Sequence, residues 1–411
     1  MTVQEYLNEK TTLFARAGIE DAENEAWLCF EVGSGMGRSE IRFSFAEEME
    51  DVLTAQRRFD LEGIFARRAD HEPLGYIVGR VPFYDQEFEV GPGVLIPRFD
   101  TEILVEAALG CLGFPQMLPG QPKLPLVSPW TDGACQNCDG EGYSDVEIYP
   151  CNSVTNADIS VLAARDGAGV SVLAARTGEP VRILDLCTGS GCVGITIAHA
   201  LWVNGIPYEL VMTELSEKAA SYARKNAERI LGGVSGNGAE PGGDRMPGYG
   251  IDYGASGDFG DGCSWRVEIA DLWPVVSLEG AFRADLIVSN PPYVTKDEME
   301  ELAPEVREYE PEMALTDEGN GLSFYERILS GLPRFLKPGG VLAVEHGSEQ
   351  GEVVRQLMQR AEAMGDVGRE PIQQTEGRYF SSGKMGISGI VTIKDYGQMD
   401  RVTCGRFGGS I

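Results

Sequence analysis

Short apolar runs alternate with stretches of helical periodicity along the chain from residue 181 onward. Runs of this kind between turn residues predict buried strands. We expect strands at 181–186, 209–213, 265–269, 284–289 and 341–345, and a last strand at 389–394 beside the fifth. Helices are expected at 193–201 and 216–231. Strands that alternate with helices are typical of an α/β domain built on a parallel sheet.

Residues 1–80 read as helical. Thr2 and Glu5 have the spacing of a capping box, which predicts a helix that ends at Ala17. We expect a second helix that carries Trp27, Leu28 and Phe30, and a third that runs through Met49, Leu53, Leu61 and Phe65. The result is a small bundle that would recognise a protein substrate, or else only pack against the rest of the chain. Spacing alone does not separate these two roles.

The alternation of Phe83, Phe88 and Val90 around Asp85-Gln86 predicts a hairpin over 81–95 that links the bundle to an α/β domain at 96–411. Two segments interrupt the α/β pattern. Residues 113–180 are rich in Pro, Gly and Asp and repeat 160–165 as 171–176, and residues 232–262 are dominated by Gly, Asp and Ser. We expect both segments to be flexible insertions.

A glycine loop follows the strand at 181–186 and opens the next helix. Glycines here would let the backbone approach a ligand closely at the helix N-terminus. The candidate ligand-binding residues of this segment are Asp185, Cys187, Thr188, Gly189, Ser190 and Gly191. Gly189, Gly191 and Gly194 also have the spacing of a dinucleotide-binding turn, so the loop alone leaves a dehydrogenase open.

Polar groups follow the next strands as well. Glu214 ends the second strand, where a carboxylate can bind the ribose hydroxyls of an adenosine. Asp271 and Leu272 follow the third strand and are placed to meet an adenine ring, and Asn290 follows the fourth. The carboxyl ends of parallel strands share one edge of a sheet, so these residues are expected to form one ligand site.

Asn290-Pro291-Pro292-Tyr293 narrows the chemistry most. The two prolines hold the backbone extended and remove donors. The Asn290 side-chain oxygen and the Pro291 carbonyl can each accept one N–H of a planar –NH2 group, while Tyr293 offers a ring to pack on it. Adenine and a glutamine amide both present such a group. Together with the other strand ends, this segment favours a methyl-donor site over a nicotinamide site.

Further motifs stand in a recognisable order. Glu72-Pro73-Leu74-Gly75-Tyr76 and Ile96-Pro97-Arg98-Phe99-Asp100-Thr101-Glu102 precede the glycine loop, and Glu345-His346-Gly347 follows the fifth strand. In this order the chain resembles the HemK/PrmC type of peptide-chain release factor glutamine N5-methyltransferases, over nearly its whole length apart from the two insertions. It departs from that family at Phe99, usually proline, at Cys187, often glycine, and at Glu214, more often aspartate.

The resemblance implies a Rossmann-like, seven-stranded class I methyltransferase domain that uses S-adenosyl-L-methionine. It also implies transfer of a methyl group to the amide nitrogen of the glutamine in the Gly-Gly-Gln motif of release factors, which modulates translation termination. Asn290 and Pro291 would orient that amide and stabilise the charge that grows on its nitrogen. No side-chain base is needed, and His71, His199 and His346 are expected to be structural.

The formal net charge of −30 weighs against direct binding of nucleic acid, because phosphate contacts need basic residues. It suits a basic protein partner. Methylation of another protein, such as a ribosomal protein, or of the exocyclic amine of adenine stays open as an alternative. A donor-binding module that has lost catalysis is disfavoured by the intact Asn290–Tyr293 segment.

Cys135 and Cys138 form half of a possible zinc site, and Cys151 is the nearest further ligand, so we expect no metal. Unevenly spaced cysteines and the absence of an apolar N-terminal segment predict a cytoplasmic protein. The chain has no run of apolar residues long enough to span a membrane. We expect a monomer that works on a protein substrate.

Overall fold

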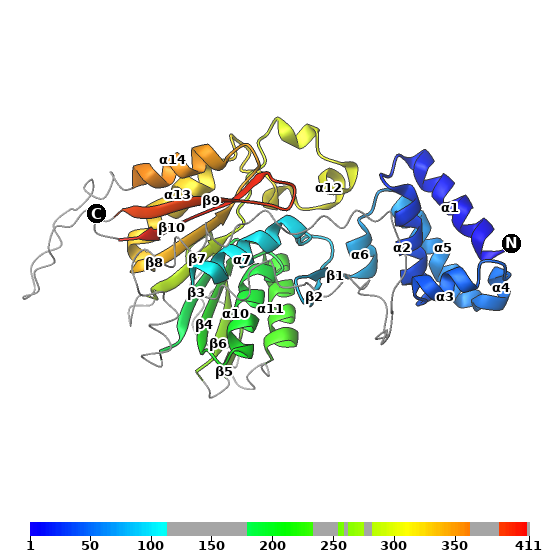
Figure 1. Cartoon of the computed structure of the whole chain (residues 1–411), viewed down its shortest axis with the longest axis horizontal. Coiled ribbons are helices and arrows are strands. Elements are labelled where there is room, and N and C mark those ends of the chain that lie inside the picture. The colour runs from blue at the N-terminus through cyan, green and yellow to red at the C-terminus, as the bar shows by residue number, and fades with distance from the viewer. Residues whose placement is uncertain (113–178, 233–253, 259–261, 275–281, 362–385, 409–411) are drawn as a thin grey trace, which may run out of the picture.

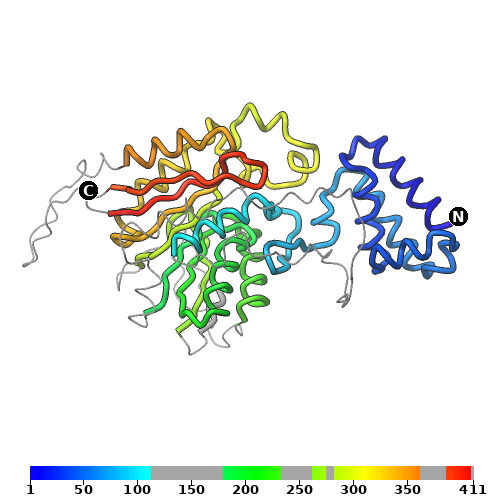
Figure 2. Tube along the Cα trace, in the orientation of Figure 1, coloured from blue at the N-terminus to red at the C-terminus, as the bar shows by residue number. Residues whose placement is uncertain are grey.

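The structure is a computed structural model that describes residues 1–112, 179–232, 254–258, 262–274, 282–361 and 386–408. The expected insertions at 113–180 and 232–262 therefore lie almost wholly outside the described residues. Within the second insertion the structure describes one short strand, β5 (Gly254–Asp258). Figures 1 and 2 show a group of helices at the N-terminus beside an open sheet that carries helices on both faces.

The N-terminal helices are α1 (Val3–Ala17), α2 (Ala22–Ser34), α3 (Arg38–Phe43), α4 (Met49–Val52), α5 (Ala55–Ala69) and α6 (Leu74–Val78). The capping box predicted at the start of α1 is present, because Thr2 Oγ1 accepts from Glu5 N and Glu5 Oε2 accepts from Thr2 N. Gly18 ends α1 in a left-handed conformation with φ 79°. Phe14, Phe30 and Phe65 are buried together in the core of this bundle.

The expectation of one continuous third helix from Met49 to Phe65 is wrong. Leu53 takes extended backbone and ends α4, and Thr54 starts α5 by accepting a hydrogen bond from Arg57 N at 3.3 Å. A side chain that caps a new helix stabilises the break, and hydrophobic spacing does not register it.

A hairpin and a pair of polar contacts join the bundle to the rest of the chain. β1 (Arg80–Phe83) and β2 (Gln86–Glu89) pair antiparallel, as the alternating pattern predicted. α12 (Pro304–Tyr309) lies against the bundle, where Glu305 accepts a hydrogen bond from Arg68 at 3.3 Å and Tyr309 donates one to the Asp70 carbonyl at 2.5 Å.

The large sheet contains β3 (Val181–Leu186), β4 (Tyr208–Glu214), β6 (Ser264–Ile269), β7 (Ala284–Ser289), β8 (Leu336–Glu345), β9 (Ile387–Lys394) and β10 (Asp400–Phe407), with β5 added at one edge. The strand order is β5-β6-β4-β3-β7-β8-β10-β9. The pairings among β6, β4, β3, β7 and β8 are parallel, whereas β10 pairs antiparallel with β8 and β9. This is the predicted seven-stranded α/β fold, extended by β5.

One strand assignment is wrong. The segment at 389–394 was expected to lie beside the fifth strand, but β10 lies between β8 and β9. Val402 and Cys404 of β10 are fully buried, while most of β9 is only partly buried. The more buried strand takes the inner position. β10 begins with the polar residues Asp400 and Arg401, so a pattern of apolar runs does not predict it.

Helices cover both faces of the sheet (Figure 1). α7 (Glu102–Cys111), α10 (Cys192–Val203) and α11 (Glu217–Leu231) contribute to one hydrophobic cluster, and α13 (Ser323–Phe335) and α14 (Gly351–Ala361) contribute to the other. α10 and α11 match the predicted helices. The chain runs from β3 to β4 and β6 on one side and then crosses to β7 on the other, so the strand order reverses between β3 and β7. Open α/β sheets bind ligands at such a reversal.

Candidate active site

A pocket opens at the carboxyl edge of the sheet, beside the point where the strand order reverses. Most of the residues proposed from the sequence line it, namely Asp185, Cys187, Thr188, Gly189, Ser190, Glu214, Asp271, Leu272, Asn290 and Pro292. Gly191, Pro291 and Tyr293 do not belong to its lining. Residues that the sequence reading did not assign to the site also line it, including Thr101, Met313 and Phe324.

The glycine loop is shaped by the buried carboxyl of Asp185. Asp185 Oδ2 accepts hydrogen bonds from Thr188 Oγ1 at 2.5 Å and from Gly194 N at 3.0 Å. Burial raises the pKa of Asp185 to about 7, although both of these bonds stabilise its ionised form. A Cβ on Gly194 would lie 2.8 Å from Asp185 Oδ2, so this position requires glycine. Asp185 therefore acts on the ligand site mainly by fixing the loop.

The loop itself uses left-handed backbone at Cys187, Gly189 and Gly191, with φ of 57°, 57° and 85°. A Cβ on Gly189 would meet no protein atom within 4 Å, which leaves this part of the loop open to a ligand. Cys187 adopts a conformation that favours glycine, at the position where the resembled family often has one. Cys187 is partly buried, and desolvation raises the pKa of its thiol.

Glu214 closes the pocket at the end of β4. Its Oε2 accepts from Gly189 N at 2.9 Å and its Oε1 accepts from Ser216 N at 2.9 Å. Burial raises the pKa of Glu214, and these backbone donors act in the opposite direction. A carboxylate oxygen has more than one acceptor position, so Glu214 can still accept hydrogen bonds from ligand hydroxyls.

Of the two pocket residues that follow β6, Leu272 is buried and Asp271 is exposed. Leu272 is buried in left-handed backbone with φ 70°, and its carbonyl accepts from Thr213 Oγ1 at 2.7 Å. Asp271 is exposed and pairs with Arg327 of α13 at 2.7 Å. Both line the pocket, as predicted, while the ion pair with Arg327 has no counterpart in the sequence reading.

Asn290 lines the same pocket as the glycine loop and comes directly after β7. Its Nδ2 donates to Thr101 Oγ1 at 3.2 Å. With the amide nitrogen engaged by Thr101, the side-chain oxygen Oδ1 is the group left to accept a hydrogen bond from a substrate. The acceptor role of this oxygen stays a prediction.

Tyr293 contacts the core of the domain. Its ring packs against a hydrophobic core cluster, and its hydroxyl lies 3.4 Å from Glu345 Oε1. The Tyr293 carbonyl accepts from Gln350 Nε2 at 2.9 Å, and a Cβ on Gly321 would collide with that carbonyl at 2.2 Å. These contacts of Tyr293 stabilise the segment at 290–293. Packing of its ring on a substrate stays a prediction.

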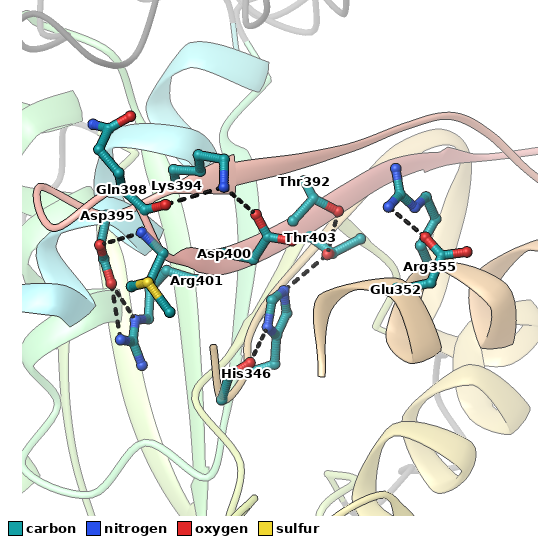
Figure 3. A network of polar contacts seen from close by, with 12 residues as sticks. His346, Glu352, Arg355, Thr392, Lys394, Asp395, Gln398, Asp400, Arg401 and Thr403 are labelled. Atoms are coloured by element: carbon teal, nitrogen blue, oxygen red, sulfur yellow. Dashed lines mark hydrogen bonds and ion pairs between the residues drawn. The ribbon is translucent and has the colours of Figure 1, made fainter. Parts of the chain in front are cut away.

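The lining of this pocket contains none of the three histidines. His346 is buried between Gly347 O at 2.8 Å and Thr403 Oγ1 at 2.9 Å (Figure 3). The carbonyl can only accept, so His346 Nδ1 carries a proton and Nε2 accepts from Thr403 when the ring is neutral. Burial lowers the pKa of His346, which favours that neutral form.

No group of three or more metal-ligating side chains occurs among the described residues. Cys135, Cys138 and Cys151 lie outside them. Within the same described ranges, no helix is long and apolar enough to cross a membrane.

The residues of the pocket fit S-adenosyl-L-methionine. Glu214 would accept hydrogen bonds from the ribose hydroxyls and Leu272 would contact adenine, as predicted from the sequence, and the open backbone at Gly189 would leave room for the donor beside the loop. Asn290 lines the same pocket and would meet the methyl acceptor. Donor and acceptor groups therefore face one cavity.

Comparisons with known proteins agree with this reading. A family model described as the PrmC N-terminal domain matches residues 5–79. The release factor glutamine methyltransferase of Geobacter sulfurreducens is 29% identical over 360 residues, which cover 87% of this chain and 89% of that protein. The same-named protein of Bifidobacterium longum is 27% identical over 357 residues, or 86% and 90% of the two chains.

Among solved structures, a methyltransferase from Pyrococcus furiosus has 15% identity and a TM-score of 0.31, and the match covers 62% of this chain and 95% of that one. This structural likeness is too slight to add to the topology. The sequence comparisons confirm the resemblance that the motifs predicted.

Proposed function

We propose, from the premise that this chain is an S-adenosylmethionine-dependent methyltransferase related to the release factor glutamine methyltransferases, that it methylates the side-chain amide nitrogen of a release factor glutamine. The observation that carries the proposal is the orientation of Asn290. Its Nδ2 is held by Thr101 at 3.2 Å, so its oxygen is presented as an acceptor in the same pocket as the donor-binding loop.

A glutamine amide is a poor nucleophile because the nitrogen lone pair is delocalised into the carbonyl. S-adenosylmethionine supplies, when bound, an electrophilic methyl group on a sulfonium. Asn290 Oδ1 would accept one N–H of the glutamine amide and hold its nitrogen in line with that methyl. The Pro291 carbonyl would accept the second N–H, which stays a prediction. These acceptors favour a more tetrahedral nitrogen and stabilise the positive charge that develops on it.

The methyl transfer needs no side-chain base. The nitrogen–carbon bond forms as the sulfur–carbon bond breaks, and the electron pair of the broken bond stays on sulfur. The methylated amide nitrogen then loses its proton to water or to a neighbouring acceptor. The absence of histidine from the pocket lining is consistent with this route.

Two observations favour a protein as the methyl acceptor. The motif order and the match of residues 5–79 to the PrmC N-terminal domain favour a protein substrate of the kind that the relatives' names state. The formal charge of −30 favours a basic protein surface over a phosphate backbone. No observation favours a ribosomal protein or adenine as the substrate. A cytoplasmic location and a monomeric state also stay predictions.

The test is a transfer assay with purified protein and radiolabelled S-adenosylmethionine. One reaction contains an intact release factor, a second contains the same factor with the glutamine of its Gly-Gly-Gln motif replaced, and a third contains adenine-bearing DNA. We expect label in the first reaction alone. Label in the second or third, or in none of them, would refute the proposed substrate.

A further inference from the structure

Three segments of the chain meet at the backbone carbonyl of Tyr293, three residues after Asn290. Gln350, which directly precedes α14, donates from Nε2 to this carbonyl at 2.9 Å. A Cβ on Gly321 would lie 2.2 Å from the carbonyl oxygen and 2.6 Å from Gln350 Nε2, so this position requires glycine. The Tyr293 carbonyl is therefore held between two other segments, and the mechanism above gives Gln350 no part.

The side-chain amide of Gln350 is hydrogen-bonded at both ends. Its Oε1 accepts from Gly347 N at 3.1 Å, while its Nε2 donates to Tyr293 O. A backbone N–H can only donate and a carbonyl can only accept, so these two partners decide which end of the amide is the nitrogen. Gln350 thus joins the turn that follows β8 to the segment that follows β7.

The backbone of Gln350 is itself anchored. Its N–H donates to Gly347 O at 3.0 Å, and its carbonyl accepts from Val354 N at 2.9 Å in the first turn of α14. Gly351 and Val354 are buried, and Val354 belongs to the same core cluster that the Tyr293 ring packs against. A side chain that starts from a packed helix end is held in place more precisely than one on a loop. Gln350 therefore presents its donor from a fixed position.

We call the segment at 290–293 the clamp. Its two prolines have no N–H, so hydrogen bonds to their nitrogens cannot hold the middle of the clamp. The start of the clamp is held by Asn290 Nδ2, which donates to Thr101 at 3.2 Å, and its end is held by the bond from Gln350 to the Tyr293 carbonyl. Prolines also fix the backbone angle φ, so a shift of the Tyr293 carbonyl is passed along the clamp toward Asn290.

We propose that Gln350 is a positioning residue that acts through the Tyr293 carbonyl to hold the clamp where its acceptors meet the substrate amide. This proposal deepens the proposed function and rests on it for the identity of that amide. Without the bond from Gln350, the Tyr293 carbonyl is free to shift, and the oxygens of Asn290 and Pro291 shift with the clamp. A misplacement of about 1 Å can cost about a hundredfold in rate.

A purely structural role for Gln350 is to support the turn before α14, and substitution separates that role from positioning. The bond from Gly347 N to Oε1 supports the turn, whereas the bond from Nε2 holds the Tyr293 carbonyl. An ionised glutamate in Q350E keeps the acceptor for Gly347 N and loses the donor to Tyr293 O. A protonated glutamate has an O–H that can donate to Tyr293 O, so it copies both bonds of glutamine.

The experiment compares wild type with Q350E and Q350M, and uses Q356E and Q356M on the exposed side of α14 as matched controls. Q350M keeps the length of the side chain and removes both hydrogen bonds. We expect Q350M, and Q350E at pH 8, to lose about tenfold to a hundredfold in kcat at saturating donor. Donor Kd should change less than about threefold, and the two controls should match wild type. A loss confined to donor Kd overturns the proposal.

Lower pH should rescue Q350E and not Q350M. A carboxylate that faces a carbonyl oxygen is disfavoured, and most charged groups around this site are acidic, so the pKa of the introduced glutamate should be raised. Those titratable groups are Tyr293, Asp317, Glu345, His346, Glu349, Glu352 and Asp400.

The kcat of Q350E, divided by that of wild type at the same pH, should rise severalfold from pH 8 to pH 5.5. The ratio cancels titrations that both proteins share, including that of Asp185. A ratio that stays low at every pH would assign the loss to packing and overturn the proposal. If Q350M does not fold, this ratio alone decides the kinetic test.

A second measurement does not depend on turnover. Nitrogen-15 labelling of asparagine gives an NMR signal for the side-chain –NH2 of Asn290, identified by its loss in Asn290→Ala. Displacement of the clamp alters the bond between Asn290 and Thr101, so this signal should shift in Q350M and in Q350E at pH 8 and stay in place in Q356M. An unchanged Asn290 signal in Q350M and Q350E overturns the proposal, even if the protein methylates no release factor.

The outcomes distinguish the two proposals. If wild type transfers no methyl group to a release factor, the proposed function fails and the Asn290 signal alone decides the role of Gln350. If wild type transfers methyl and both Q350M and Q350E have the kcat of wild type at pH 8, the proposed function stands and the role of Gln350 is refuted.

Discussion

We call the glycine loop with Glu214 the donor wall of the pocket, and Asn290 with Thr101 the acceptor wall. The hydrogen bonds that hold these two walls span very different separations along the sequence. On the donor wall, Asp185 bonds Thr188 and Gly194, three and nine residues away, and Glu214 bonds Gly189, 25 residues away. On the acceptor wall, Asn290 bonds Thr101 across 189 residues. The donor wall is thus largely a local property of one βαβ unit, whereas the acceptor wall exists only when the whole domain is folded.

The two walls also differ in what their buried carboxyls contact. Asp185 accepts two hydrogen bonds through Oδ2, while Glu345 keeps Oε2 without a partner among the described residues. A satisfied carboxyl stabilises the loop around it, and an unsatisfied one destabilises the fold. The carboxyl on the donor wall is therefore the more fully hydrogen-bonded of the two. Substitutions at four positions test this comparison.

The largest effect is expected from Asn290→Ala on the acceptor wall. Removal of the acceptor should lower kcat by about a hundredfold to a thousandfold, because a preorganised polar group on a developing charge contributes that much to the rate. Donor Kd, measured by calorimetry, should stay within about threefold, since the donor wall is untouched. Asn204→Ala at the exposed end of α10 is the matched control. Turnover unchanged in Asn290→Ala would show that the clamp assignment is wrong.

Glu214→Gln should have the opposite profile. The substitution removes the charge that strengthens hydrogen bonds to the donor hydroxyls, and such bonds contribute about 1.5–3 kcal/mol. Donor Kd should therefore rise by about tenfold or more, while kcat at saturating donor stays near wild type. Steady-state kinetics at several donor concentrations separate the two quantities. A loss confined to kcat would mean that Glu214 does not bind the donor.

Glu345→Gln tests the stability difference. Burial raises the pKa of Glu345 to about 7, so its ionised form is disfavoured in the folded protein. A group with a raised carboxyl pKa contributes stability at low pH and loses it as pH rises through the folded-state value. At pH 8 the neutral glutamine should raise the free energy of unfolding by about 1 kcal/mol or more, and at pH 5 the gain should be smaller. Denaturant unfolding at both pH values measures this, and an equal change at both would contradict it.

The smallest effect is expected at Cys187. Left-handed backbone with φ 57° strains any residue that has a Cβ. Cys187→Gly should be more stable than Cys187→Ala by about 1 kcal/mol, because both lose the thiol and only glycine escapes the strain. Thermal unfolding of the two variants gives the difference. A more stable alanine variant would mean that the loop does not adopt this conformation in solution.

The same contrast in contact range explains what the sequence could predict. The glycine loop, Glu214 and the four strand ends follow from local patterns, and the structure places nearly all of them in one pocket. Asn290 could be predicted as a site residue because the two prolines and the tyrosine that follow it form a distinctive motif. Thr101 and Glu345 were visible only as parts of motifs of the resembled family, because no local pattern shows that Thr101, just before α7, meets Asn290 after β7.

Two errors have physical reasons of a similar kind. The break between α4 and α5 depends on the Thr54 hydroxyl, and hydrophobic spacing does not include caps. The position of β10 depends on which of two strands buries more side-chain surface against β8, which follows from packing. The contacts of Tyr293 with the core also could not be read from its neighbours in sequence, and packing of its ring on a substrate stays a prediction.

The central claim is tested most directly by peptide mass spectrometry of a release factor after incubation with this protein and S-adenosylmethionine. The account predicts one added methyl group on the glutamine of the Gly-Gly-Gln motif, none after replacement of that glutamine, and none with the Asn290→Ala variant. A methyl group on any other residue of the release factor, or an unmodified factor with wild-type protein, would contradict it.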